Sequence, residues 1–544
     1  MRTRHKHLAI LSAFTAMSAM STLAGHAHAV LVNSTWNGGS GSWQNAANWT
    51  PNTQFPNNGN GGDTYNATVS AGQATLNAGV TIEQLSLTGG AIALNGNDLF
   101  ADQPFTWTGG IVFGPGSLIT NIIEISGGTN KLLSNSFLVN NNSTTMTGTG
   151  SLIGLDGAQI QNETTGIFDL LTDTSILNGG GTFTYINKGK FRKVGGAGNS
   201  NAQAIVDNTG SVEARSGTLT LTNAPTQLAA SVLNGGAWIA ANGGHLLINA
   251  IINALGPDTT VTLDGAGSSF NTINGITSNQ GKINVQNGAT FNPTAATLTN
   301  TGEVNVTGGS NLTTANHIIN DTPGKIQITN STVHSNTLDN DGEIHVNQPG
   351  GILIVDGKLL NNGLLVVNGM VQSGDVLDNS GQLRGKGTIQ ADVLNSGLIA
   401  PGLGDGTDIL TIMGNLELAP SGELEIGLKG TTPGSEHDQL IVDGTAILGG
   451  TLRIVGLAGL SFLPGDVFNI LLAGAIQGSF SDVILPLNGN NEPLFEVLIN
   501  STSVQLRALR IDQPPVDGTI PEPATFATLL LGGACLTRSR RRRA

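Results

Sequence analysis

Apolar and polar residues alternate over short stretches of this chain, and one turn pattern recurs between the stretches. The pattern is an apolar residue followed by Asn-x-Gly, with an apolar residue again two positions after the glycine, as in Val304 after Gly302. Period-two alternation is typical of a β-strand with one buried face. The pattern's glycines are Gly189, Gly210, Gly281, Gly302, Gly342, Gly363, Gly381 and Gly397, with looser versions at Gly166 and Gly324.

Where these turns follow one another directly, they lie 16 to 23 residues apart. Repeats of this length are typical of solenoids, in which each unit is too small to bury its own apolar face and must stack on its neighbours. We therefore predict an all-β fold, a parallel β-helix with coils about 4.8 Å apart. The alternative is an antiparallel sandwich, which would need two-residue hairpin turns between matched strands. The single recurring corner favours the solenoid.

Stacked coils bring equivalent residues of successive turns into columns. The turn asparagines should then form partial amide ladders along one corner, as in other stacked β structures; they are Asn279, Asn300, Asn340, Asn361, Asn379 and Asn395. The residue after the glycine alternates in charge through Lys282, Glu303, Lys325 and Glu343. This alternation predicts a salt ladder on the outer face of one sheet.

The first part of the body differs from the repeats, because Trp36, Trp43 and Trp49 lie within 14 residues. Two interpretations are open. The indoles could form an exposed platform on which sugars stack, or they could close the open end of the solenoid, whose strand edges are otherwise unpaired. A terminal cap is required of any solenoid, so the cap is favoured. The opening also resembles the start of bacterial secreted repeat proteins of the autotransporter-passenger type.

Both ends of the sequence carry targeting patterns. Basic residues Arg2, Arg4 and Lys6 precede an apolar run, and Ala27-His28-Ala29 is a small-x-small cleavage site, so we expect a signal peptide over residues 1–29. At the other end, Pro521-Glu522-Pro523 precedes the apolar stretch 524–536 and then Arg538, Arg540, Arg541, Arg542 and Arg543. Thirteen apolar residues are short of the ~20 that a stable membrane span needs.

This three-part tail resembles the PEP-CTERM sorting signal of Gram-negative bacteria that make extracellular polysaccharide. The resemblance implies that residues 524–536 form a short helix that tethers the protein transiently to the inner membrane, with the arginines on the cytoplasmic side. It further implies that an exosortase-type protease cuts near Pro521-Glu522-Pro523 and releases the protein to the cell surface. The alternative, a solvated basic tail that binds nucleic acid, is disfavoured by the apolar run directly before the arginines.

The region after Gly397 has longer strands, and its segments Asp438–Gly444, Leu448–Leu452 and Gly478–Phe480 resemble the C-terminal part of autotransporter-like passengers in PEP-CTERM proteins. A true autotransporter ends in a membrane β-barrel, for which the 34 residues after Arg510 are too few. We therefore expect export by another route. The expected regions are a signal peptide (1–29), an N-terminal cap with the first coils (30–105), helix repeats (106–400), the C-terminal β region (401–510), a linker (511–520) and the sorting tail (521–544).

Charge and cysteine content limit the partners that the body can bind and the bonds that can stabilise it. The signal and tail together hold eight of the 23 basic and one of the 37 acidic residues, which leaves a net charge of −21 on the body. Such a body repels nucleic acid, so we expect no nucleic-acid partner. The only cysteine, Cys535, lies in the tail, so the body has no disulfide. Gly makes up 77 of 544 residues, and only 11% are charged, which suits many short strands and turns.

Several groups of residues resemble catalytic or binding sites, and each also has an ordinary structural explanation. Gly404–Leu410 matches half of a calcium-binding nonapeptide but occurs once. The histidines lack zinc-ligand spacing. The threonines of 218–222 form a single row, so an ice-binding face is not expected. Candidate acids of a polysaccharide lyase or hydrolase are Asp339, Asp341, Asp375 and Asp378, and a basic segment that could contact an anionic polymer is Lys188, Lys190, Arg192 and Lys193.

The expected protein is an exported, non-enzymatic structural or adhesive component of the cell surface or extracellular matrix, with no catalytic residues, cofactor or metal. Its expected partners are the sorting protease and, as a further candidate, extracellular polysaccharide. The alternatives are a polysaccharide-active enzyme on the same scaffold and a carbohydrate-binding module.

Overall fold

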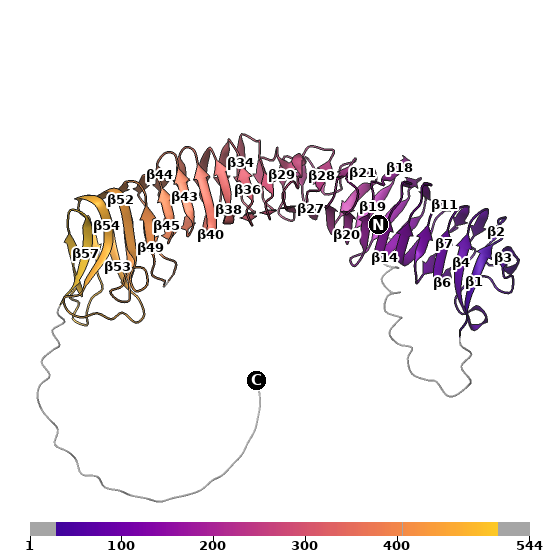
Figure 1. Ribbon diagram of the computed structural model, residues 1–544, viewed down its shortest axis with the longest axis horizontal. Helices are drawn as coiled ribbons and strands as arrows, with labels where there is room; N and C mark the ends of the chain where they lie inside the picture. The colour runs from indigo at the N-terminus through magenta and orange to yellow at the C-terminus, as the bar shows by residue number, and fades with distance from the viewer. Residues whose placement is uncertain (1–28, 405, 510–544) are drawn as a thin grey trace, which may run out of the picture.

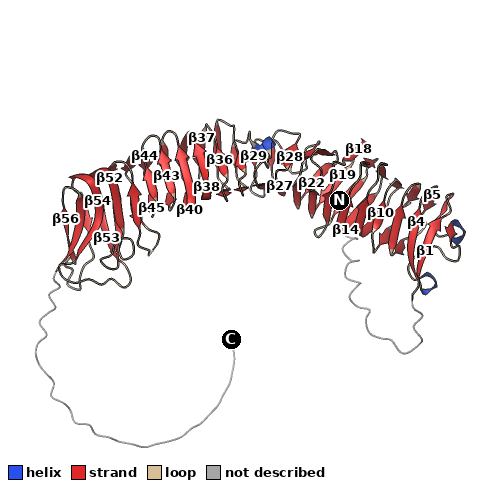
Figure 2. Cartoon of the chain, viewed as in Figure 1, coloured by secondary structure: helices blue, strands red, loops and turns tan. Residues whose placement is uncertain are grey.

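The computed structural model describes residues 29–404 and 406–509, and within them the chain is a long arch of stacked β-coils (Figure 1). Nearly all regular structure is strand (Figure 2). The helical pieces among the described residues are three short 3-10 turns, Ala46–Asn48, Asn60–Gly62 and Asn271–Ile273. The predicted parallel β-helix is confirmed. Three expected segments lie outside the described residues: residues 1–28 of the signal peptide, the linker, and the sorting tail with its expected short apolar helix.

Each coil contributes strands to three faces, which we call faces 1, 2 and 3. Face 1 begins each repeat just after the glycine, face 3 follows it, and face 2 ends at the turn asparagine. Pairing between coils is parallel throughout the stack; for example, Lys282 to Gln286 pairs residue for residue with Glu303 to Thr307. The long strands β12, β14, β38, β40, β52 and β54 bend around a corner and contribute to two faces.

Face 1 runs through the whole described chain as one parallel sheet. Its strands are β1 Leu31–Trp36, β4 Thr64–Val69, β7 Gln84–Leu87, β10 Phe105–Trp107, part of β12 Ser117–Ile125 and of β14 Phe137–Met146, β17 Ile167–Leu170, β20 Lys190–Lys193, β23 Ser211–Ala214, β27 Ala237–Ala241, β30 Thr260–Asp264, β32 Lys282–Gln286, β35 Glu303–Thr307, part of β38 Lys325–Ser335 and of β40 Glu343–Val355, β42 Leu364–Val367, β45 Gln382–Gly385, β48 Leu398–Pro401, β51 Glu423–Leu428, β53 Thr451–Gly456 and β55 Asp482–Ile484.

Face 2 carries the turn asparagines at its strand ends. Its strands are β6 Val80–Ile82, β9 Leu99–Ala101, parts of β12 and β14, β16 Gln159–Asn162, β19 Thr184–Asn187, β22 Ile205–Asn208, β26 Val232–Leu233 with its antiparallel partner β25 Leu228–Ala229, β29 Ala254–Leu255, β31 Ser278–Asn279, β34 Thr297–Asn300, β37 His317–Asn320, β39 Thr337–Asn340, β41 Leu359–Asn361, β44 Leu377–Asn379, β47 Val393–Asn395, β50 Leu416–Leu418 and parts of β52 Gln439–Leu448 and β54 Val467–Gly478.

Face 3 consists of two runs of paired strands, of which the first is a separate sheet and the second is continuous with the other faces through strands that bend around a corner. The first has ten strands, β2 Ser40–Ser42, β5 Gln73–Thr75, β8 Ala91–Ala93, β11 Gly110–Phe113, β13 Lys131–Ser134, β15 Leu152–Leu155, β18 Ile176–Gly180, β21 Asn199–Ala202, β24 Thr218–Leu221 and β28 His245–Ile248. The second comprises β33 Thr290–Phe291, β36 Asn311–Thr313, β43 Met370–Ser373, β46 Thr388–Gln390, β49 Ile409–Ile412 and parts of β38, β40, β52 and β54.

The core is a set of apolar columns that run along the inside of the stack. The residue two positions after each turn glycine points inward, as the alternation predicts, and the column through Ile283, Val304, Ile326, Ile344, Leu365, Leu383 and Ile399 is at most 2% exposed. Each coil is thus apolar on its inner side and covers the coil before it. Burial along these columns is the main stabilising contribution, since the described residues lack any disulfide.

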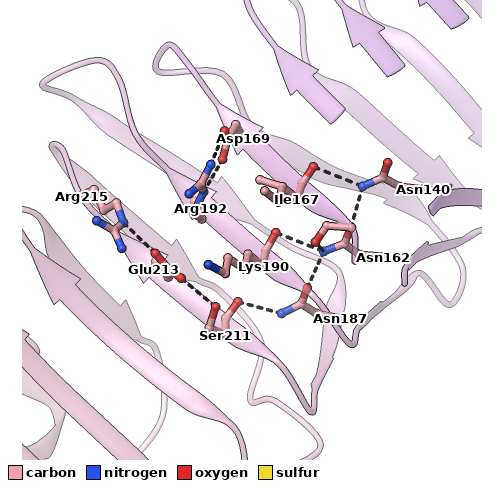
Figure 3. Close-up of polar contacts among 11 residues, drawn as sticks. Asn140, Asn162, Ile167, Asp169, Asn187, Lys190, Arg192, Ser211, Glu213 and Arg215 are labelled. Carbon is pink, nitrogen blue, oxygen red and sulfur yellow. Dashed lines mark hydrogen bonds and ion pairs between the residues drawn. The ribbon is translucent and has the colours of Figure 1, made fainter. Parts of the chain in front are cut away.

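Buried asparagines form two ladders at the corner after face 2. In each ladder, Nδ2 donates to Oδ1 of the asparagine in the next coil, over 2.6 to 2.8 Å. Nδ2 also donates to a backbone carbonyl, as from Asn162 to Lys190 (Figure 3). The short ladder is Asn140, Asn162, Asn187 and Asn208; the long one is Asn279, Asn300, Asn320, Asn340, Asn361, Asn379 and Asn395.

The two ladders are separated by coils in which the column is apolar. Leu233 and Leu255 lie in register with Asn279, so two leucines precede the long ladder at the same corner. At the other end, Asn395 is followed in register by Leu418. The first acceptor of each ladder, Oδ1 of Asn140 and of Asn279, is buried and accepts no hydrogen bond from the described residues.

The N-terminal end of the stack is closed by aromatic side chains. Trp43 and Trp49 are fully buried and Trp36 nearly so, with ring centroids of Trp36 and Trp49 5.0 Å apart and of Trp43 and Trp49 4.6 Å apart. Both of these fully buried indole N–H groups have a partner: Trp43 Nε1 donates to the Pro56 carbonyl over 2.8 Å, and Trp49 Nε1 donates to the Trp43 carbonyl. Buried rings cannot serve as an exposed sugar-stacking platform.

At the C-terminal end, an antiparallel pair covers part of the stack. β57 Ser503–Ala508 pairs with β54, and β56 Phe495–Ile499 pairs with β57. The Phe495 ring of β56 packs against the rings of Phe462 and Phe468, with centroid distances of 4.8 and 5.5 Å.

Candidate functional site

In the middle of the arch, the concave side is formed by face 1. In Figure 1, the face 1 strands β20, β27, β40 and β45 lie along the inner rim, whereas β18, β29, β34 and β44 of the other faces lie along the outer rim. The curvature of solenoids commonly creates extended concave surfaces that bind other molecules. The outward side chains of face 1 are therefore the first place to look for a site.

Over five consecutive strands of face 1, β30, β32, β35, β38 and β40, every outward side chain is polar. We call this surface the polar grid. It has three side chains per strand in columns along the solenoid axis, and strand pairing keeps them in register. The grid consists of Thr260, Thr262, Asp264, Lys282, Asn284, Gln286, Glu303, Asn305, Thr307, Lys325, Gln327, Thr329, Glu343, His345 and Asn347.

Apolar residues border the grid at both ends. The strand before it, β27, presents Ala237 and Ile239 at the outward positions. The strand after it, β42, presents Leu364, and Val366 in the next outward position is covered, with 1% exposed. Charged side chains within the grid nearly balance, since two lysines face three acidic residues. The grid is thus a nearly neutral polar area on a strongly acidic body.

The first column of the grid contains the predicted salt ladder. Lys282, Glu303, Lys325 and Glu343 are in register on successive strands. Lys282 Nζ lies 3.1 Å from Glu303 Oε2, and Lys325 Nζ lies 3.5 Å from Glu343 Oε2. A hydrogen bond from Asn305, together with the nearby Lys282, lowers the pKa of Glu303; a hydrogen bond with His345, together with Lys325, lowers the pKa of Glu343. The carboxylates therefore stay charged at neutral pH.

The middle column is a chain of side-chain amides and hydroxyls. Asn305 Nδ2 donates to Asn284 Oδ1 over 3.1 Å, and Asn284 Nδ2 donates to Thr262 Oγ1 over 3.3 Å. These side chains are only half-buried, so they have room for further hydrogen bonds. An amide offers both donors and acceptors, which suits recognition of an uncharged, hydroxyl-rich polymer laid along the column.

The candidate catalytic aspartates do not converge. Asp339 and Asp378 are on the outer side of face 2, and Leu360 lies between them in register, so they are two coils apart. Asp339 lies 3.4 Å from His317 Nε2, and Asp378 pairs with Lys358 at 2.9 Å. Asp341 accepts a hydrogen bond from Asn362, and Asp375 accepts one from the next backbone N–H, as turn residues do.

The basic segment is largely neutralised by acidic partners in the previous coil. Lys188 pairs with Glu163 at 2.9 Å, and Arg192 binds Asp169 through two hydrogen bonds of 2.6 and 2.7 Å (Figure 3). The bond with Asp169 raises the pKa of Arg192. Lys190 is outward and exposed. Because these cations are paired with carboxylates, the segment has little net positive charge with which to bind an anionic polymer.

Lys193 differs from the rest of the basic segment, because its side chain is inward and buried. Nζ donates to Asp173 Oδ1 over 2.7 Å and to the Gly195 carbonyl over 2.9 Å. Lys193 also lowers the pKa of Asp173. Its inward position could be read from the alternation with Phe191, but its partner could not, because Asp173 comes from the previous coil.

The half-matched calcium motif is part of the strand connections near β49. Backbone N–H of Asp408 donates to Asp438 Oδ1 over 2.9 Å, and Asp408 lies 3.6 Å from Lys386 Nζ. Asp405 is outside the described residues. Among the residues that are described, no group of three or more His, Cys, Asp or Glu side chains is placed to hold a metal ion.

Two adjacent buried residues in the last coils, His437 and Asp438, were not suggested by the sequence. Asp438 accepts hydrogen bonds from the backbone N–H of Gly427 and Asp408 over 2.7 and 2.9 Å, and burial raises its pKa to about 7. His437 is fully buried, with Nδ1 3.1 Å from the Gly430 carbonyl, and burial lowers its pKa. The pair fixes the loop before β52 and is turned away from solvent, so it is structural.

The predicted sorting motif (Pro521, Glu522, Pro523, Arg538, Arg540, Arg541, Arg542 and Arg543) lies outside the described residues. Of the predicted cleavage site, Ala29 is the first described residue and Ala27 is not described. Val30, the expected new N-terminus, donates its backbone N–H to Asp63 Oδ1 over 3.0 Å. A helix long and apolar enough to cross a membrane is not found in the described ranges 29–404 and 406–509.

Comparison with known proteins gives a limited result. No protein-family profile matches this sequence, and no curated protein matches it. Among solved structures, the chain is similar to the Haemophilus influenzae Hap adhesin, with 12% sequence identity and a TM-score of 0.30. The match covers 82% of this chain and 64% of the adhesin chain, so this chain spans less than two thirds of that structure. A likeness this low carries no argument about function; the strand pairing itself establishes the fold.

Proposed function

We propose that this protein is an exported, non-enzymatic surface rod that has a structural or adhesive role, and that it contacts an uncharged polysaccharide through the polar grid. The observation that carries the proposal is the grid itself: fifteen polar side chains in register on the concave face, bordered by apolar strands and nearly neutral within an acidic body. Because the coils repeat, the grid presents similar groups at regular intervals. A polymer of repeating units could therefore make similar contacts with successive coils.

A binding experiment tests the grid directly. Residues 30–509 are titrated with neutral and with anionic polysaccharides, and Asn284, Asn305 and Gln327 are replaced together by Ala. Each lost hydrogen bond contributes about 1 kcal/mol, so affinity for the neutral polymer should fall roughly tenfold or more. The matched control replaces Gln159, Gln161 and Thr184, which are outward on face 2. Equal loss in both variants, or no binding to any polymer, would contradict the proposal.

The location is proposed from the two ends of the sequence. The signal over residues 1–29 directs export. The tail, with Pro521-Glu522-Pro523, residues 524–536 and the arginines, supports transient tethering at the inner membrane of a Gram-negative cell, cleavage by an exosortase-type protease and release to the surface or matrix.

Cell fractionation tests this route. Deletion of residues 538–544 should change the fraction in which the protein accumulates, whereas replacement of the five arginines by Lys should preserve sorting, because the positive charge is retained. Unchanged location after the deletion would refute the assignment of the tail.

A further inference from the structure

The last strand of face 1 has an unpaired edge. β55 pairs with β53 on one side, and no backbone hydrogen bond from the described residues reaches its other side. The neighbouring faces end differently: β57 pairs with β54 where face 3 ends, and Ile476 on face 2 donates its N–H to the Ser501 carbonyl. At this end of the described chain, face 3 is therefore paired, face 2 is held by a single backbone hydrogen bond, and face 1 is open.

The core is also open at β55. Val483 continues the inward column that contains Ile399, Leu424 and Leu452, in register from strand to strand. Those three residues are at most 2% exposed, whereas Val483 is 39% exposed. Ile484 beside it is 38% exposed. An unpaired strand edge next to an exposed core residue is a ready template for another strand.

The first strand of face 1 has a complementary free stretch. β3 Trp49–Thr50 pairs with Thr35 and Trp36 of β1, so the outer edge of β1 is covered there. Leu31, Val32 and Asn33 have no such partner in the described chain, and Leu31 is 51% exposed. Val32 is inward on this strand and half-buried against the core. The free part of β1 and the whole of β55 are each three residues long.

We propose that β1 of a second copy pairs in parallel with β55, so that copies join head to tail and extend face 1 across the junction. A second copy is the occupant that the geometry fits, because β1 and β55 are the two ends of the same parallel sheet. Face 1 is parallel from β1 to β55, so parallel pairing of the two strands continues the sheet in the same sense and sets Val32 beside Val483 on the core side. Pairing of two β55 edges would instead be antiparallel.

Such a contact uses a different surface on each partner, so copies add head to tail, into an open filament or, where the curvature of the arch closes the path, into a ring. The inference goes beyond polymer binding and does not depend on it, since the polar grid lies in the middle of the arch and the contact lies at its ends.

The test is association of residues 30–509, which contain the complete described solenoid from β1 to β57. Sedimentation analysis over a range of concentrations should show dimers, trimers and longer species, and electron microscopy should show rods joined end to end. Val483→Lys places a charge in the contact, and Leu31→Asp places a carboxylate beside Asp482, so each should abolish association. Leu247→Lys, an equally exposed apolar position on face 3 in the middle of the arch, should associate as before.

Mixing the two variants is the decisive step. The Val483→Lys chain retains an intact β1 edge and the Leu31→Asp chain retains an intact β55 edge, so a 1:1 mixture should form a dimer and stop there. Unchanged circular dichroism melting confirms that each variant is folded. The proposal is overturned if the wild-type chain stays monomeric, if it forms only closed dimers, if the mixture forms no dimer, or if residues 30–544 stay monomeric.

Discussion

Two columns of side chains run along the same coils, one inside the corner after face 2 and one outside on face 1, and they differ in environment. The long asparagine ladder is at most 1% exposed, and its amides are 2.6 to 2.8 Å apart. In the salt ladder of Lys282, Glu303, Lys325 and Glu343, side chains are 37 to 50% exposed and the ion pairs measure 3.1 and 3.5 Å. The same register between coils aligns the side chains of both ladders. The asparagine ladder should contribute more to stability because it is buried.

The largest effect is expected inside the long ladder. Asn340→Leu removes the acceptor of Asn320 Nδ2 and the donor to Asn361 Oδ1, which leaves two buried polar groups without their partner. Each such group costs about 1–3 kcal/mol, so the free energy of unfolding should fall by roughly 2–5 kcal/mol. Urea denaturation measures the loss, and hydrogen exchange should localise it to the neighbouring coils. Asn305→Leu, on the exposed grid, is the control; an equal loss there would remove the distinction between the two columns.

A buried group that titrates should behave unlike the neutral amides. Burial raises the pKa of Asp438 to about 7, so the folded state favours the protonated acid. The contribution of Asp438 to the free energy of unfolding should therefore be greatest at acid pH and should decline as pH rises from about 4 to about 7.

Burial lowers the pKa of His437, so this residue works in the opposite direction: its contribution is present above its ordinary pKa and is lost as pH falls through the folded value. Denaturation of Asp438→Asn over pH 4–8 should lack the decline due to the acid, and His437→Gln should lack the loss on acidification. If both variants followed the wild-type pH profile, neither group would be linked to folding. The destabilisation caused by Asn340→Leu should not vary with pH.

The start of the long ladder should tolerate a change that its middle does not. Asn279 Oδ1 accepts no hydrogen bond from the described residues, and leucines already occupy the column in the two preceding coils. Asn279→Leu leaves only Asn300 Oδ1 without a donor and extends the apolar column. We expect a loss of about 1 kcal/mol or less in the same denaturation assay. A loss as large as that of Asn340→Leu would show that position in the ladder is unimportant.

The smallest effect is expected on the salt ladder. Glu303→Lys places three like charges in the column, but the side chains are well exposed and solvent screens them. In low salt, the free energy of unfolding should fall by less than about 1 kcal/mol, and the melting temperature should fall slightly. Both differences should shrink in high salt. Lys358→Glu next to Asp378 on face 2 provides a comparable exposed reversal. No change at low salt would exclude a role of the ladder in stability.

The sequence was sufficient for the features that repeat. The Asn-x-Gly turn and the inward residue two positions later predicted the solenoid, the corner ladder and the alternation of charge, because stacking repeats any local pattern. Asn320 fills the gap between Asn300 and Asn340, although its turn departs from the consensus as Asn320-Asp321-Thr322-Pro323-Gly324. The short ladder from Asn140 to Asn208 was not expected as such, since only part of it follows the turn pattern.

Features that depend on contacts between unlike segments could not be predicted. The buried Lys193 pairs with the exposed Asp173 of the previous coil, and His437 and Asp438 are buried in the last coils. The curvature that makes face 1 concave results from small differences between successive coils and leaves no mark in the alternation. The same is true of the β56 and β57 pair, whose antiparallel direction follows from where the chain turns back.

The asparagine ladder also bears on how the length of this protein can vary. Every asparagine inside it accepts from one identical neighbour and donates to the other, so insertion or loss of one complete coil leaves the number of bonds per coil and the two terminal groups unchanged. Only the ends carry an unshared amide group. A gene encoding this rod can therefore gain or lose whole repeats between Asn300 and Asn379 at little thermodynamic penalty, whereas a partial repeat would shift the corner and break the column.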